Sequence, residues 1–362
     1  MAYYKAMKSL LYNLLGVCFS LVVIFVLGEL ISIGYYEATP VPVVLPPYDY
    51  RQLDEDFGWL TKANYSYSSV LADLAGAEYK VELTTNQFGF RAFGDTETDT
   101  KAKVLFIGDS YTYALEVSDS KTYYNILADT LSFEAFAYGS GGYGNLQEYL
   151  ILDQYFELIN PDVVVLQVCS NDFMDNYHKL EIASFYTVGK KRPYLNSKDN
   201  IIYRTPIPFL EQVKDYSKFI YFIGKKIESI KNHEDDPVKL AEELIAIKGN
   251  NYPLFTHSVD ITELILKRFK ARIPKETQFL VFSADHFQPQ YDEFKRICQK
   301  NEISFLSGLP FDIERAEKKG IPIRGYDGFH WNEAGHRVVA NLLSVELDKI
   351  LDEQISIIKG PK

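Results

Sequence analysis

The feature that most constrains the fold is a series of short, continuously apolar segments between residues 101 and 362, interleaved with amphipathic segments. The apolar segments are KVLFIG, FEAFAYG, DVVVLQV, QFLVFSA and ISFL, and the segments with helical spacing are KTYYNILADTL, NLQEYLILDQYFELINP, YDEFKRICQKN and NEAGHRVVANLLSVELDKIL. A strand that is apolar on both faces must be covered on both faces, which is typical of a parallel sheet between helical layers. The sequence therefore predicts one doubly wound α/β domain, with Asn332 as the N-cap of the closing helix.

Between about residues 175 and 255 the alternation of strands and helices stops, although FLEQVKDYSKFIYFIGKKIESIK has helical spacing. Long connections without their own strand–helix pattern are usually functional in a compact domain. We expect a largely helical insertion that covers the active edge of the sheet as a lid.

The N-terminus contains LLGVCFSLVVIFVLGELISIG, an apolar stretch of about twenty residues, which is the length that crosses a bilayer. Lys5 and Lys8 precede it and acidic residues follow it, so we expect the N-terminus in the cytoplasm and the bulk of the chain outside. Residues 1–36 are predicted to form a cytoplasmic stub and a transmembrane anchor. Residues 37–100 are predicted to form a proline-rich spacer and a lead-in segment. A cleaved signal peptide is the alternative, since SIG before Tyr35 is a small-x-small pattern.

Glu29 lies inside the apolar stretch, where a carboxylate is costly. We expect it near the outer interface, where its side chain can reach water. The alternative is that it marks a partner or a function.

Charge and cysteine content exclude some classes of function. The formal net charge is −11 and no basic stripe contradicts it, which argues against nucleic acid as a partner. Cys18, Cys169 and Cys298 are far apart, and no pair has metal-ligand spacing. The sequence therefore predicts neither a disulfide framework nor a metal site.

Polar residues follow the apolar segments at the places where a doubly wound sheet forms its sites, the carboxyl ends of its strands. GDSYT places Ser110 there, GSGGYGN places Gly142, CSND places Asn171, and the late loop YDGFH places Asp327 and His330. These residue types suit nucleophilic catalysis, in which a histidine removes the proton of a serine and a carboxylate holds the histidine. Backbone N–H groups of Ser110 and Gly142 and the amide of Asn171 can stabilise the resulting oxyanion.

The four blocks GDSYT, GSGGYGN, SND and DGFH occur in the order of the signature blocks of the SGNH/GDSL hydrolase superfamily, and the chain resembles a membrane-anchored bacterial member. The resemblance covers residues from about 104 to 345 and includes the upstream TNQFGFR. It implies a flavodoxin-like α/β/α sandwich and Ser-His-Asp ester hydrolysis. It further implies Ser110, His330 and Asp327 as the catalytic triad, and Ser110, Gly142 and Asn171 as the oxyanion hole.

Two departures from the family pattern affect the pocket rather than these roles. Ala137 lies near the place where the second block often has an asparagine, and Cys169 replaces the glycine of the third block. A purely structural alternative also exists for each site residue. In that alternative Ser110 is a helix N-cap, Gly142 a turn glycine and Asn171 a loop cap.

Three neighbouring residues have weaker assignments. We expect His336 to pack or hydrogen-bond in the first turn of the last helix, and Asp172 to orient the loop that holds Asn171. Asp285 is expected to be a surface loop residue, with a substrate contact as the alternative.

The predicted function is a membrane-anchored, extracytoplasmic serine esterase with its catalytic domain in the bacterial periplasm. The expected substrates are small acyl esters, namely O-acetyl groups on a cell-envelope or secreted polysaccharide. The chemistry requires no cofactor. An O-acyltransferase with the same residues and a non-catalytic scaffold subunit of a membrane complex are the alternatives, and a protein partner could bind through the anchor.

Overall fold

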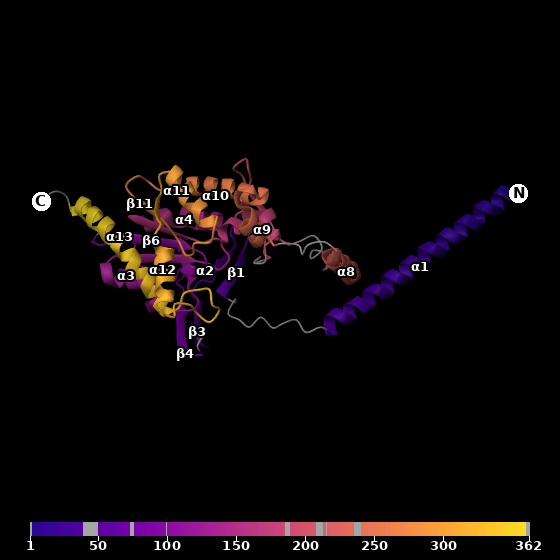
Figure 1. The fold of residues 1–362 in the computed structure, drawn as a ribbon, viewed down its shortest axis with the longest axis horizontal. Coiled ribbons are helices and arrows are strands. Elements are labelled where there is room, and N and C mark those ends of the chain that lie inside the picture. Colours follow the sequence, from indigo (N-terminus) through magenta and orange to yellow (C-terminus); the bar gives the residue numbers. More distant parts are fainter. Residues whose placement is uncertain are drawn as a thin grey trace. The chain divides into compact units, whose positions relative to one another are not determined.

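The computed structural model describes residues 2–38, 50–72, 76–98, 100–184, 189–207, 213–214, 216–234 and 240–359. The chain divides into two compact units. The smaller comprises Met1–Pro46 and Ile207–Lys239, and the larger comprises Pro47–Pro206 and Leu240–Lys362. Figure 1 labels their elements along the chain.

The larger unit is built on a six-stranded sheet with the order β12-β11-β8-β6-β7-β5. The strands are β5 (Ala92–Phe93), β6 (Lys103–Gly108), β7 (Glu134–Gly139), β8 (Val163–Val168), β11 (Gln278–Ser283) and β12 (Ser304–Leu306). All neighbours pair in parallel except β5, which adds an antiparallel edge to β7. Numbered along the chain, the parallel strands have the order 2-1-3-4-5, which is the flavodoxin-like doubly wound order. The predicted fold class is confirmed.

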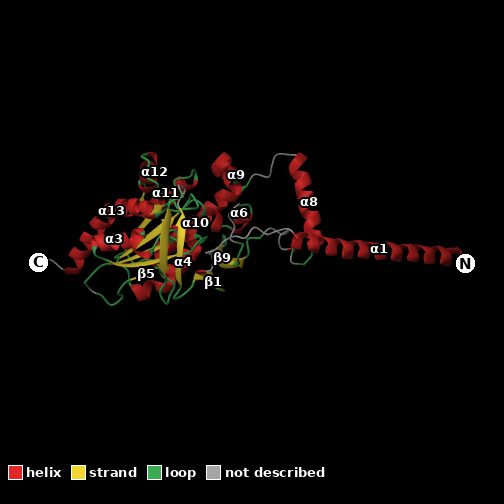
Figure 2. Ribbon diagram, turned by 90° about the horizontal axis from the view of Figure 1, so that it is seen from below, coloured by secondary structure: helices red, strands yellow, loops and turns green. Residues whose placement is uncertain are grey.

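The two faces of the sheet carry separate cores because successive side chains of a strand point to opposite faces. Along β6, Leu105 and Ile107 belong to one core cluster, and Val104 and Phe106 belong to the other. The first cluster includes residues of α4 (Asn145–Ile159), α10 (Pro253–Arg272) and α11 (Gln290–Lys300). The second includes residues of α3 (Tyr123–Leu131), α12 (Leu309–Lys318) and α13 (Glu333–Lys359). Figure 2 shows α3 and α13 on one side of the sheet and α4 and α10 on the other.

Most elements follow the sequence pattern, and the helix boundaries have local causes. Asn332 accepts a hydrogen bond from the Gly335 N–H through its side chain, 3.0 Å, so the predicted N-cap of α13 is confirmed. The helix α4 ends where Asn160 adopts a left-handed conformation with φ of 48°. The helix α12 was not predicted.

Short elements surround the sheet. They are the hairpin strands β1 (Arg51–Asp54) and β2 (Gly58–Thr61), the strands β3 (Ser66–Ala72) and β4 (Glu78–Thr84), the helices α2 (Ser110–Tyr113) and α5 (Asp172–Asp175), and the 3-10 turns η2 (Asp119–Lys121) and η3 (Gly249–Asn251). The lead-in is therefore rich in strands, and its segment TNQFGFRA turns at Gly89 before it becomes β5.

The region of the predicted insertion contains α6 (His178–Ile182), the hairpin β9 (Arg192–Leu195) and β10 (Ile201–Arg204), α8 (Lys218–Glu234), α9 (Ala241–Lys248) and the start of α10. It is largely helical, but its chain is shared between the two units, because α8 groups with the N-terminal helix. The predicted role of the insertion as a lid stays a prediction.

The smaller unit pairs α8 with α1 (Ala2–Ala38). Within α1, the 24 residues Tyr12–Tyr35 are apolar and long enough to cross a membrane. Length and composition alone support a membrane span, so membrane anchoring through α1 is a proposal.

Candidate active site

The site lies at the carboxyl ends of β6 and β8, which are neighbours in the sheet. The chain leaves β6 toward β7 on one side and later returns to β8 on the other. This is the switch point of a doubly wound sheet, where the connecting loops leave a crevice. Ser110 is the second residue after β6 and begins α2, and Asn171 lies just beyond β8. The fold thus brings two of the predicted site residues to one place.

His330 connects a third predicted residue, Asp327, to Ser110. Its Nε2 lies 2.8 Å from the Ser110 Oγ, and its Nδ1 contacts Asp327 Oδ2. The other oxygen of Asp327 accepts hydrogen bonds from the N–H groups of Phe329, 2.9 Å, and His330, 3.0 Å. Asp327 therefore fixes both the loop and the imidazole that the loop carries.

Ser110 is not a helix cap. The N-cap of α2 is Asp109, whose carboxylate accepts from the Tyr111 N–H at 2.9 Å. The capping alternative for Ser110 is therefore wrong, and its hydroxyl faces the imidazole instead.

The charges around His330 favour its protonated form. Burial alone would lower the pKa of His330, but the carboxylates of Glu116 and Asp327 outweigh it and raise this pKa to about 9. Burial likewise pushes the pKa of Asp327 upward, and the hydrogen bond and charge of His330 reverse that shift and lower it. The resting site is therefore an ion pair near neutral pH, and neutral imidazole accumulates at alkaline pH.

Glu116 is a second carboxylate at the histidine that the sequence analysis missed. Its Oε1 lies 3.4 Å from His330 Nδ1, on the same nitrogen that contacts Asp327. Its side chain is 4% exposed, and burial raises its pKa to about 7. No local motif marks Glu116, which follows Ser110 by six residues. Only the tertiary structure shows that it lies beside the histidine.

The glycine loop after β7 lies next to Ser110. A Cβ atom built on Gly141 would be 3.8 Å from the Ser110 Cβ, and Gly142 has a φ of +76°. Two residues of the lead-in hold this loop: Tyr50 Oη accepts from the Gly141 N–H at 3.1 Å, and Arg51 donates to the Gly141 carbonyl at 3.0 Å. The loop is therefore positioned for a donor role, and the assignment of Gly142 to the oxyanion hole stays a prediction.

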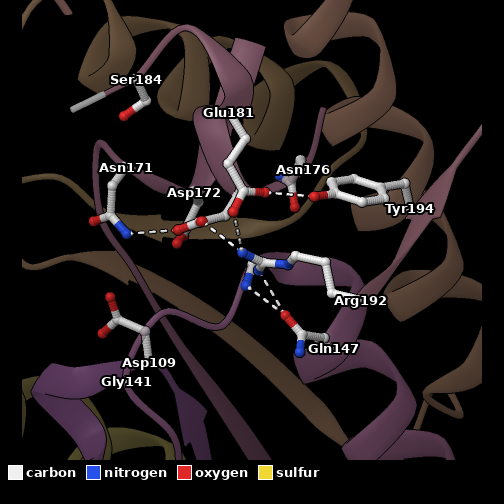
Figure 3. Close-up of polar contacts among 12 residues, drawn as sticks. Asp109, Gly141, Gln147, Asn171, Asp172, Asn176, Glu181, Ser184, Arg192 and Tyr194 are labelled. Carbon is white, nitrogen blue, oxygen red and sulfur yellow. Dashed lines mark hydrogen bonds and ion pairs between the residues drawn. The ribbon is translucent and has the colours of Figure 1, made fainter. Parts of the chain in front are cut away.

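The side-chain amide of Asn171 is held by a buried network that reaches beyond its own loop. Its amide Nδ2 donates to Asp175 Oδ2 at 2.8 Å, and Asp175 Oδ1 accepts from Arg192 Nη1 at 2.6 Å. Arg192 also donates to Gln147, 2.6 Å, and lies 3.3 Å from Glu181. Figure 3 shows this chain of contacts from Arg192 to Asn171. A primary amide has two N–H donors, so one remains for a ligand while Asp175 holds the other.

Arg192 was not predicted, although it comes from the region recognised as an insertion. Its side chain is 1% exposed, and its hairpin strand β9 brings a permanent positive charge to two buried carboxylates. A buried ion pair of this kind needs good geometry and further hydrogen bonds to offset desolvation, and Arg192 has both. The insertion is thus part of the support of the candidate site.

The departure at Cys169 has a structural explanation. Its thiol donates to Asp109 Oδ2 at 2.9 Å and contacts the Asn171 side-chain oxygen. Burial raises the pKa of Cys169, so the group stays a thiol and acts as a hydrogen-bond donor. Cys169 therefore links the residue before Ser110 to Asn171, a link that glycine cannot make. The other departure, Ala137, is buried within β7 and pairs with Phe106.

The structure also shows the contacts of His336, Asp172 and Asp285. His336 is buried and its Nδ1 accepts from the Tyr123 N–H at 3.2 Å, as expected. Asp172 accepts from the Cys169 N–H at 3.1 Å and so orients the loop of Asn171. Asp285 is not a free surface residue, because its carboxylate accepts from the Ser170 N–H at 3.1 Å and ties the loops after β8 and β11 together.

Arg91, in the lead-in segment TNQFGFRA, supports the chain after Ser110. It is buried, and its guanidinium donates to the carbonyls of Tyr113 and Ala114 and pairs with Asp119 at 2.6 Å. The carbonyl groups at the end of the short helix α2 are thereby satisfied.

Among the residues that the structure describes, two groups of side chains have donor atoms close enough to share a metal ion: Glu116, Asp327 and His330, and Asp109, Cys169 and Asp172. In the first group His330 Nδ1 already contacts Asp327, and in the second the sulfur carries a proton that it donates to Asp109. A metal ligand must be a thiolate or a neutral imidazole, so both groups fit hydrogen bonding better than metal binding. The absence of a metal site and of a cofactor stays a prediction.

No family model and no curated protein matches the chain. Among solved structures it is similar to the psychrotrophic esterase EstA from Pseudoalteromonas sp., with 10% identity over 70% of this chain and 100% of that chain and a TM-score of 0.39. It is similar to TesA, with 12% identity over 69% and 99% of the two chains and a TM-score of 0.38. A family 3 carbohydrate esterase from Clostridium thermocellum shows 14% identity over 69% and 98%, with a TM-score of 0.35. At such identities and TM-scores these likenesses carry no argument about function.

Proposed function

We propose that this protein is a serine esterase that hydrolyses small acyl esters through Ser110, His330 and Asp327. The observation that carries the proposal is the continuous contact from Ser110 Oγ to His330 Nε2, 2.8 Å, and from His330 Nδ1 to Asp327. A nucleophile, a base and an orienting carboxylate that are joined by hydrogen bonds form the arrangement that activates a serine.

The reaction proceeds in two halves. Ser110 Oγ forms a bond to the ester carbonyl carbon while its proton passes to His330 Nε2, and the carbonyl oxygen becomes an oxyanion. The oxyanion is stabilised by the N–H groups of Ser110 and Gly142 and by the free N–H of the Asn171 amide. Collapse breaks the bond to the alcohol oxygen, which takes the proton from His330. Water then adds to the carbonyl carbon of the acyl-enzyme while its proton passes to His330. Collapse breaks the bond to Ser110 Oγ, which takes that proton back as the acid is released.

Membrane anchoring and an extracytoplasmic site complete the proposal. The support is the apolar span Tyr12–Tyr35, preceded by lysines, which by the positive-inside rule orients the larger unit away from the cytoplasm. This corresponds to the periplasmic side of a bacterial inner membrane. The proposed substrates are O-acetyl groups on a cell-envelope or secreted polysaccharide. Beside the histidine, Phe329 is 61% exposed and offers an apolar ring on which a sugar can lie.

An O-acyltransferase would use the same residues and pass the acyl group from Ser110 to a sugar hydroxyl instead of water. Product analysis with an acceptor glycan separates the two. The scaffold alternative has less support, because the Glu29 carboxylate, which could have bound a partner protein, accepts hydrogen bonds from residues of the same chain.

The test is labelling of the full chain, in detergent, with a fluorophosphonate probe, which reacts with activated serines. We expect labelling of the wild type and of Ser68→Ala, an exposed serine of β3, and none of Ser110→Ala or His330→Ala. Hydrolysis of p-nitrophenyl acetate and of acetylated glycans should show the same pattern. A folded wild type that neither labels nor turns over any ester would overturn the proposal.

A further inference from the structure

We propose that α8 is a second membrane contact, an amphipathic helix that lies in the lipid headgroup layer beside the outer end of α1. The inference builds on the proposed anchoring of α1. It commits to a lipid bilayer as the occupant of the exposed apolar face of α8.

The first observation is that Glu29 fixes the start of α8 on α1. Its carboxylate accepts from the Ser217 hydroxyl at 2.7 Å and from the N–H groups of Lys218, 2.7 Å, and Phe219, 3.1 Å. These are donors that a helix leaves unsatisfied in its first turn, and a negative charge there also suits the helix dipole. The carboxylate of Glu29 in α1 thus caps the N-terminus of α8.

Aromatic packing supports the same junction. The ring of Phe219 lies edge-on to Phe25, with ring centroids 6.0 Å apart, and Phe222 lies edge-on to Tyr35 at 5.9 Å. A Cβ atom built on Gly28 would lie 2.6 Å from the Phe219 ring, so only glycine permits this approach. One face of α8 is therefore fixed against α1.

A second face of α8 is apolar and exposed. Ile220, Ile223 and Ile227 are 48%, 42% and 48% exposed. At about 100° per residue these three side chains share one stripe, next to the face that packs on α1. Lys218 and Lys225 fall on the opposite side of the helix. An exposed isoleucine stripe opposed by lysines is the pattern of a helix that lies at a membrane surface.

The level and direction of α8 agree with a bilayer as the occupant. Glu29 lies six residues before the end of the span at Tyr35, or about 9 Å along the helix, which is near the membrane–water boundary. Figure 2 shows α8 at a steep angle to α1, close to the end of α1 that lies away from the N-terminus. A helix that crosses a membrane-spanning helix at this level lies in the plane of the membrane. The isoleucines then enter the acyl boundary and the lysines stay at the headgroups, where anionic lipids attract them.

The consequence concerns how the larger unit is held. The chain passes between the two units three times, after residues 46, 206 and 239. Because α8 is fixed to α1 through Glu29, all three connections start from the unit that contacts the membrane.

The test places single nitroxide labels on the full chain in vesicles of phosphatidylethanolamine and phosphatidylglycerol. Cys18 is replaced by serine, because it is exposed, whereas Cys169 and Cys298 are buried. Labels at Ile223→Cys and Lys225→Cys compare the two faces of α8, and a label at Leu21→Cys reports insertion of α1. Collision rates with oxygen, which concentrates in lipid, and with a water-soluble nickel chelate are measured at each position.

We expect the labels at positions 21 and 223 to collide more often with oxygen than with the nickel chelate. The label at position 225 should collide more often with the nickel chelate. Lipid contact at 21 with water contact at both 223 and 225 would overturn the inference and leave the anchor intact. Protection of 223 from both reagents would indicate a protein occupant and overturn it as well. Water contact at 21 would remove the proposed anchoring and the inference with it.

A matched pair of variants tests the role of Glu29. Glu29→Ala removes the cap, whereas Leu30→Ala changes the adjacent residue, which is 62% exposed. We expect Glu29→Ala to lose the oxygen contact at position 223 and Leu30→Ala to keep it. Equal behaviour of the two variants would contradict the proposed junction.

Discussion

The two sides of the candidate site are built in different ways. On the histidine side, His330 and Asp327 have side chains 25% and 23% exposed, and the group opposite the carboxylates is an imidazole that can lose its proton. On the amide side, Arg192 and Asp175 are 1% and 4% exposed, and the cation is a guanidinium that cannot. The difference suits the proposed esterase chemistry. A base must exchange protons with substrate and solvent, whereas an oxyanion donor must hold one direction throughout the reaction.

The largest effect is expected on the histidine side. Asp327→Asn leaves the imidazole without its orienting carboxylate, and we expect kcat for p-nitrophenyl acetate to fall by up to about 10⁴-fold. Because Glu116 lies 3.4 Å from the same nitrogen, it can partly replace Asp327, so the double variant with Glu116→Gln should fall further than the two single effects combined. Additive effects would show that Glu116 does not replace Asp327 as the carboxylate that orients His330.

On the amide side the main effect should be on stability. Arg192→Met leaves Asp175 and Glu181 buried without their cation, which typically costs about 3–5 kcal/mol of unfolding free energy. Urea unfolding followed by tryptophan fluorescence measures it, since Trp59 lies 5.1 Å from the Arg192 guanidinium. The control is Arg204→Met on the neighbouring strand, where the arginine is exposed and a change within about 0.5 kcal/mol is expected. A loss of similar size in both variants would contradict the role of the buried network.

Asn171→Ala should affect the transition state rather than binding. Loss of one oxyanion donor costs about 3–4 kcal/mol, so kcat should fall about 10²- to 10³-fold with little change in KM. Asn341→Ala, at an exposed position of α13, is the control. If KM rose while kcat stayed constant, Asn171 would contact the substrate in the ground state and the oxyanion assignment would be wrong.

The smallest effect is a displacement of the pH profile. The pKa of His330 is raised to about 9, and only the neutral form acts as a base, so kcat/KM of the wild type should rise through this pH. Glu116→Gln removes a negative charge that raises this pKa, so the rise should move to lower pH. Glu55→Gln, an exposed acid of the lead-in, should leave the profile unchanged. A profile that is the same in Glu116→Gln would mean that the charge of Glu116 does not reach the imidazole.

Much of the fold was predictable because it depends on local patterns. Continuously apolar strands, helical spacing and the polar residues at strand ends gave the doubly wound sheet and placed Ser110, Asn171, Asp327 and His330 at one edge. The residues that were missed have no such pattern. Glu116 lies in the ordinary loop after α2, and Arg192 lies in the hairpin strand β9, which the sequence analysis treated only as part of an insertion.

The sequence by itself determined the order of the strands along the chain, the apolar N-terminal span and the four motif blocks, since these follow from residue type and spacing. Only the tertiary structure decided which charges meet. A carboxylate contacts a histidine or an arginine according to how loops fold over the sheet. Those contacts join residues such as Asp175 and Arg192, or Glu116 and His330, that no period in the sequence relates. Burial then sets their strength, because the same pair that is weak in water becomes strong once the surrounding chain excludes solvent.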